Sequence, residues 1–242
     1  MSESKELALK EPDYLANINP LDNESPAAQD DIKVPNIIIA QPNGSCMKDG
    51  DPGFIDGIRA GQFYNNVTRE VLGKVITRQF IHYFKVYNIY KGTPASPEWV
   101  GAVPEADFLK LRNRQFNKDV GIMTTDLPDQ FIKENWRFVL SDDSFDFSFM
   151  NIKPGGIQEA KNWVNMMQSY FSKGKDVMTF EWEIPTFLKA SKTTNNSSYQ
   201  IDGSHIKHVG YVSEAQYQKA KRIKEEIKRS QDQHLQQVSE DY

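Results

Sequence analysis

The sequence predicts an α+β fold in which a curved, mainly antiparallel sheet packs against two helices. Segments rich in β-branched and aromatic residues outnumber helical ones, and the two kinds do not alternate as they do in a parallel doubly wound sheet. Only two segments combine helical periodicity with the length of a stable helix. At 242 residues the chain can hold one sizeable core, or one core and a smaller subdomain.

The first 33 residues differ from the rest in composition. They contain eight Asp/Glu and three Lys, a net charge of −5, so the remainder of the chain has +1 of the formal total of −4. They include three prolines and lack apolar periodicity, which is typical of an extended or disordered arm. The sequence therefore predicts an acidic N-terminal arm (1–33), a β-rich domain (34–212), and a charged C-terminal helix with a short acidic tail (213–242).

Strands are predicted from β-branched and aromatic runs that lie between turns rich in Gly, Pro and Asn. A short strand at 34–40 precedes a loop at 41–61. A hairpin then joins 62–65 to a long strand at 71–91, and a Gly/Pro-rich break follows at 92–97. Beyond a shorter strand and helix, a long loop is expected at 113–130. The other predicted strands are 99–103, 136–140, 145–152, 178–188, 199–201 and 205–211.

Two helices have an apolar face. The first follows Gly155-Gly156 and repeats apolar residues every three or four positions as far as Phe171. The second starts at Ser213, where Gln216 completes a capping box, and runs to about residue 231. A short helix is expected from Pro104 to about Arg114, since proline suits a first helical turn. About five strands interrupted by one helix are the usual ingredients of an OB-like, partly open barrel, and we predict that architecture.

Several kinds of site are disfavoured by the sequence. Cys46 is the single cysteine, so neither a disulfide framework nor a Cys-rich zinc site is expected. No phosphate-binding glycine loop or serine-nucleophile turn is present, and we expect a non-enzymatic protein without metal or cofactor. The Asp-rich stretch at 142–146 is interpreted as a turn, and His205 and His208 as edge histidines. No apolar run approaches a membrane span, which favours a soluble intracellular protein.

The segment 71–91 combines aromatic residues with recurring Lys and Arg and contains no acidic residue. Rings that stack on bases and cations that contact phosphates are what single-stranded nucleic acid requires. The alternative is a core strand whose cations extend to the rim. The residues predicted to bind nucleic acid are Arg69, Lys74, Arg78, Tyr83, Lys85, Tyr87, Tyr90, Lys91, Trp99, Trp136 and Arg137.

The tryptophans and the chain terminus refine this hypothesis. Trp99 and Trp136 have Pro/Gly-rich or charged neighbours and are the better stacking candidates, whereas Trp163 lies in an amphipathic helix and is expected in the core. The chain ends Glu240-Asp241-Tyr242. An acidic tail with a terminal aromatic can compete with DNA or dock on a replication partner, although a tail this short and weakly acidic also arises by chance.

Four segments resemble a group of bacteriophage proteins described as single-stranded DNA-binding proteins: 32–37, 61–73, 160–165 and 208–215. The resemblance implies an OB-type binder of single-stranded DNA, or of RNA, that acts in phage replication or recombination in the cytoplasm of the infected bacterium. Its partners would be replication proteins, with homo-oligomers another expectation. Pro94, Pro97 and the 113–130 loop depart from the pattern. The alternative is a virion structural or assembly protein whose arm and C-terminal helix grip neighbouring subunits.

Overall fold

The computed structural model describes residues 35–94, 96–117, 122–125, 129–144, 146–190 and 197–240, with side chains as far as residue 229 except at 104 and 106. Val34–Tyr242 forms one unit. In its described residues, an open mixed sheet is combined with helices α1 (Glu105–Lys110), α2 (Ile157–Phe171) and α3 (Glu214–Glu240). The predicted α+β class, with a curved sheet and two long helices, is confirmed. The predicted arm lies outside the described residues.

The main path of the sheet has the strand order β11-β10-β4-β8-β9-β1-β2-β3. Described neighbours pair antiparallel except β1 and β9, which are parallel and make the sheet mixed. The strands are β1 (Asn36–Ile39), β2 (Phe63–Asn65), β3 (Val71–Gly73), β4 (Val75–Thr93), β5 (Ser96–Pro104), β6 (Gln115–Asn117), β7 (Ile122–Thr124), β8 (Gln130–Ser141), β9 (Phe147–Ile152), β10 (Phe180–Ala190), β11 (Ser197–Ile201) and β12 (Lys207–Tyr211).

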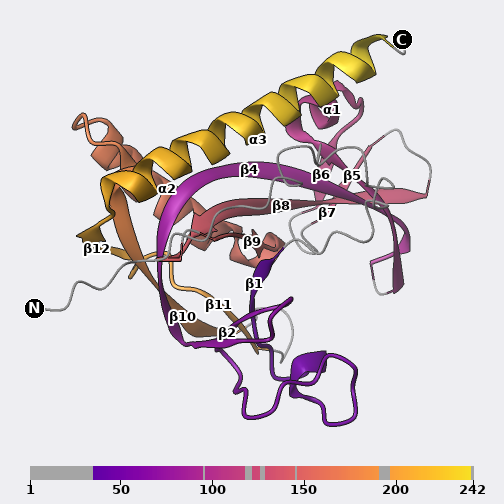
Figure 1. The fold of residues 1–242 in the computed structure, drawn as a ribbon. Helices are drawn as coiled ribbons and strands as arrows, with labels where there is room; N and C mark the ends of the chain where they lie inside the picture. Colours follow the sequence, from indigo (N-terminus) through magenta and orange to yellow (C-terminus); the bar gives the residue numbers. More distant parts are fainter. Residues whose placement is uncertain are drawn as a thin grey trace, which may run out of the picture. The chain divides into compact units, whose positions relative to one another are not determined.

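β4 is the central strand. It is 19 residues long and pairs with β10 at its start, with β8 along most of its length, and with β5 at its end. A bulge in the β8 pairing between Phe80 and His82 adds an unpaired residue. Because bulges bend a strand and increase its twist, this position helps to give β4 the long curve seen in Figure 1.

The structure departs from the predicted elements in several places, and the strand predicted at 71–91 is divided into β3 and β4. β8 begins at Gln130 rather than at 136, because it includes Lys133, Glu134 and Asn135, three consecutive polar residues that interrupt the apolar pattern on which the prediction depended. The 113–130 region contains the short strands β6 and β7. The Gly/Pro-rich break at 92–97 is the turn of the β4–β5 hairpin, in which Gly92 has a φ of 86° that favours glycine.

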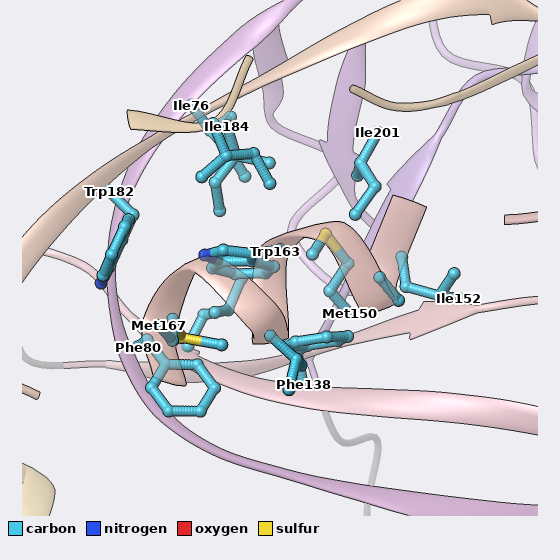
Figure 2. Close-up of a cluster of buried hydrophobic side chains, with 14 of the residues drawn as sticks. Ile76, Phe80, Phe138, Met150, Ile152, Trp163, Met167, Trp182, Ile184 and Ile201 are labelled. Carbon is cyan, nitrogen blue, oxygen red and sulfur yellow. The ribbon is translucent and has the colours of Figure 1, made fainter. Parts of the chain in front are cut away.

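The main core lies between α2 and the concave side of the sheet. Figure 2 shows Trp163 of α2 surrounded by side chains from β4, β8, β9, β10 and β11. Its ring is stacked on Phe138 with centroids 4.7 Å apart and meets Trp182 edge-on at 6.4 Å. Trp163 is fully buried, as the helical periodicity predicted.

α3 packs on the opposite side of the sheet. Ala220 and Ile223 lie against Ile81 of β4 and Val139 of β8, and Ile227 extends the contact. In Figure 1, α3 runs along the outer side of β4. The central strands are therefore covered on both sides over part of their length. No helix in the described part of the chain is long and apolar enough to cross a bilayer.

Replacing Trp163 by alanine should lower the free energy of unfolding by about 3–5 kcal/mol, because it leaves a large cavity at the centre of the core. Trp99→Ala is the matched control: Trp99 is 61% exposed, so its loss should change stability by no more than about 0.5 kcal/mol. Urea unfolding followed by circular dichroism measures both. Equal effects of the two substitutions would contradict the described core.

Candidate nucleic-acid interface

Side chains alternate along β4, so the predicted site residues lie on two different faces. Tyr83 and Tyr87 point to the side of the sheet that α1 and α2 cover, because they pack with Trp136 and Phe108, respectively. Tyr90 is three residues beyond Tyr87 and lies on the opposite face. The structure therefore does not bring the predicted tyrosines together on one surface.

Two of the predicted stacking residues are buried. Tyr87 is 4% exposed and its ring is stacked on Phe108 of α1 at a centroid distance of 3.8 Å. Burial, reinforced by the charges of Glu134 and Glu105, raises the pKa of Tyr87. Trp136 is 6% exposed, and its Nε1 donates to Glu134 Oε1 at 2.6 Å. The expectation that these rings face a nucleic acid is wrong, because other protein groups already cover them.

Tyr83 and Lys85 lie beside Trp136 and are also engaged. The half-buried Tyr83 ring is stacked on Trp136 at 5.4 Å. Lys85 Nζ forms an ion pair with Glu105 Oε1 at 2.6 Å. Burial acts to lower the pKa of Lys85, but the hydrogen bond and charge of Glu105, with Glu134, outweigh it and raise that pKa. Lys85 is thus a neutralised cation, poorly suited to a phosphate contact.

Three predicted cations lie near the beginning of β4. Arg69 Nη2 donates to the carbonyl oxygen of Pro52 at 2.9 Å. Arg78 is half-buried, and its Nη1 donates to the carbonyl oxygen of Thr77 at 2.8 Å. Lys74 is exposed just before the strand starts. These groups lie at the opposite end of β4 from Lys91 and from Trp99, which pairs with Tyr90.

The other predicted residues lie near the distal end of β4 or at the chain terminus. Lys91 is exposed, and Trp99 of β5 is 61% exposed and pairs with Tyr90. Of the predicted tail, Glu240 is the last residue of α3. Asp241 and Tyr242 lie outside the described residues.

Arg137 marks a different surface, on the α3 side of the sheet. Its Cζ lies 5.9 Å from the ring centroid of Phe84 and 5.2 Å from that of Phe149. Its Nε donates to Asn151 Oδ1 at 2.7 Å. Burial lowers the pKa of Arg137, but a guanidinium stays protonated at neutral pH. Two rings and an amide thus hold a charged group in place.

Lys133 repeats this arrangement four residues earlier on β8. Its Nζ lies 5.1 Å from the ring centroid of Tyr90 and 5.3 Å from that of Phe131. Lys133 and Arg137 are four residues apart on β8 and so share a face. Within the described part of the chain, neither forms an ion pair with a carboxylate. Phe84, Tyr90, Phe131, Lys133, Arg137 and Phe149 are here called the cation–aromatic face.

α3 adds positive charge at the border of this face. Lys224 and Lys228 lie one helical turn apart beside His82 of β4. Burial, followed by the charges of Lys224 and Lys228, lowers the pKa of His82 to about 4. A histidine held neutral beside cations indicates a positive potential where α3 meets β4.

The acidic and histidine residues considered as metal ligands have structural roles. Asp142 Oδ1 accepts hydrogen bonds from the backbone N–H groups of Ser144 and Asp146, which confirms the predicted turn. His205 Nδ1 lies 2.8 Å from Asp202 Oδ2. Among the described residues, no three His, Cys, Asp or Glu side chains gather in a metal-binding group.

Of the cation–aromatic face, the residues predicted from the sequence include Tyr90 and Arg137 but not the other four. Phe131 and Lys133 lie between the loop predicted at 113–130 and the strand predicted at 136–140. The run Phe131-Ile132-Lys133-Glu134 does not alternate between apolar and polar residues, so it gave no period-2 strand signal. Phe149 lies on a predicted strand. Its proximity to Arg137 depends on the β8–β9 register, in which Arg137 pairs with Asn151.

Replacing Lys224 and Lys228 by glutamine should raise the pKa of His82 from about 4 toward its ordinary value, because two positive charges are removed. Lys207→Gln, whose ammonium pairs with Glu183, is the control and should leave that pKa unchanged. NMR titration of the imidazole measures the pKa. An unchanged His82 pKa in the double variant would contradict the placement of Lys224 and Lys228 beside His82.

The same histidine makes stability depend on pH. Because the folded pKa lies below the ordinary value of 6.5, the unfolded chain binds the proton more tightly. The contribution of His82 to stability should therefore be constant above about pH 6.5 and should be lost as the pH falls toward about 4. His82→Gln should show a smaller loss over this window in chemical unfolding. If the free energy of unfolding depends on pH in the same way in both proteins, His82 is excluded as the source of the loss.

Comparison with known proteins gives the chain a family. Residues 3–233 match the model of the family described as Pam3 phage gp34-like protein. No curated protein and no solved structure matches the chain. The family match agrees with the phage origin that the sequence resemblance implied. Because it spans well over half of the 242 residues, the chain belongs to the Pam3 phage gp34-like family and is a bacteriophage protein.

Proposed function

We propose that this phage protein binds single-stranded DNA through the cation–aromatic face, as a non-enzymatic partner in replication or recombination in the infected cell. The observation that supports this most directly is the state of Lys133 and Arg137. Each is positioned over two rings, and neither is neutralised by a carboxylate in the described part of the chain. Positive groups held along a sheet face in this way suit the phosphates of a flexible polyanion.

The aromatic groups have two roles in this proposal. The half-buried rings of Phe84, Phe149 and Tyr90 hold the cations in position, since a ring face attracts an ammonium or guanidinium group. Trp99 is the ring available for stacking, because it is 61% exposed and lies next to Tyr90 in the β4–β5 register. Lys224 and Lys228 extend the positive surface along α3.

The double substitution Lys133→Ala/Arg137→Ala should weaken binding to a labelled oligo(dT) in low salt and reduce its dependence on salt. Loss of two phosphate contacts should make the slope of log K against log salt shallower by roughly 1.4, at about 0.7 per contact for single strands. Lys85→Ala is the matched control, because Lys85 is paired with Glu105 on the other face. Fluorescence anisotropy at several salt concentrations measures both quantities.

Two results would overturn this proposal. One is the absence of oligo(dT) binding by the unmodified protein at low salt. The other is an equal loss of affinity in the Lys85→Ala control and the double variant. That result would show that binding does not depend specifically on the cation–aromatic face.

Trp99→Ala should cost about 1–3 kcal/mol of affinity for oligo(dT), the usual contribution of one base stacked on an aromatic ring. Phe171→Ala is the control, because Phe171 is 59% exposed at the end of α2, away from this face. Titration of both folded variants gives the comparison. Unchanged affinity in Trp99→Ala would assign the tryptophan another role.

A virion structural or assembly role is the second candidate, and α3 favours it. The last described side chain that packs on the sheet is that of Ile227, whereas the helix continues to Glu240. A helix of this kind could pack against neighbouring subunits, including copies of this chain. Mass spectrometry of purified phage particles tests this role: stoichiometric amounts support it, and absence from the particles removes it.

A further inference from the structure

Two carboxamides lie among the cations of the proposed binding face. Asn88 of β4 pairs with Lys133 of β8. Asn135 lies on β8 midway between Lys133 and Arg137, and successive residues on one face of a strand are roughly 7 Å apart. Because paired residues point to the same side of a sheet, both carboxamides share the face of these cations.

Among the described residues, neither carboxamide has a protein partner. Asn88 and Asn135 are half-buried, and in the described part of the chain no hydrogen bond involves either side chain. Asn151, on the same face, contrasts with them: its Oδ1 accepts from Arg137, and its Nδ2 donates to Asn36 Oδ1 at 2.9 Å. Asn88 and Asn135 therefore keep their donors and acceptors available for a ligand.

We propose that Asn88 and Asn135 hydrogen-bond to base edges, so that the face recognises the bases of a single strand as well as its phosphates. This inference rests on the proposed function of the face. A carboxamide offers a donor beside an acceptor, the pair that matches N7 and the N6 amino group of adenine. Phosphates have no donor at neutral pH, so an amide oxygen gains nothing from them. The ligand class is therefore single-stranded nucleic acid that carries bases, and adenine is the base whose donor and acceptor the carboxamide is expected to match.

The flanking cations support this assignment by geometry. Lys133 and Arg137 stand on either side of Asn135 along one strand, and each is fixed over its own pair of rings. A backbone that contacts both cations must pass over Asn135. Its bases are then within reach of the carboxamides and of Trp99, which pairs with Tyr90 two residues beyond Asn88.

The test compares oligo(dA) with an abasic oligomer of the same length and charge, each bound to the full chain and to Asn88→Ala/Asn135→Ala. The double variant should bind oligo(dA) about tenfold more weakly than the unmodified protein, as expected for the loss of one bidentate base contact. Its affinity for the abasic oligomer should be unchanged. Lys133→Ala/Arg137→Ala is the contrasting variant and should weaken binding to both oligomers.

The possible outcomes separate this inference from the proposed function. If the asparagine variant loses the same affinity for both oligomers, or loses affinity for neither, recognition of bases by Asn88 and Asn135 is overturned. The proposed binding of single-stranded DNA would be unaffected by that result. Failure of the unmodified protein to bind either oligomer at low salt would overturn the proposed function itself. Because neither asparagine side chain makes a hydrogen bond in the described structure, the double variant should fold, and its unfolding curve provides the check.

Discussion

The alternation of side chains along β4 is the constraint on which the rest of the structure depends. One set of positions packs toward α2 and the main core, and it includes both Phe80 and Tyr83 because the bulge between Phe80 and His82 shifts the alternation by one residue. The other set, including Phe84, faces the side on which α3 lies. A strand that contributes to two packed layers has few side chains left exposed, and the cation–aromatic face lies on the α3 side, where Phe84 and Phe149 border the contact between α3 and the sheet.

The two faces of the sheet differ in what each cation contacts, more than in how many cations they carry. Lys85 is matched by Glu105, whereas Lys133 and Arg137 are matched by rings. A carboxylate neutralises a cation, but a ring holds it in place with its charge intact. Burial and then the charges of Lys224 and Lys228 lower the pKa of His82, so these two lysines add positive charge where α3 meets the sheet. A protein with a net charge of −4 can therefore present a locally cationic surface.

The sequence predicted most of the elements, because periodicity and turn residues are local signals. The capping box at Ser213 did mark the start of α3, and its atoms form the expected hydrogen bonds. Which face of a strand is covered is not a local property. Trp136 has charged neighbours in sequence, yet it is buried because Tyr83 stacks on it. The contact of Arg137 with Phe149 likewise depends on strand register, which residue spacing does not specify.

The most direct test of the account is photo-crosslinking of a single-stranded oligonucleotide to the full chain, with the linked residues identified by mass spectrometry. The account predicts crosslinks at the exposed Trp99, at Tyr90 and at Phe149, all on one side of the sheet. Crosslinks confined to aromatic residues elsewhere, such as the exposed Phe171 and Tyr211, would contradict it.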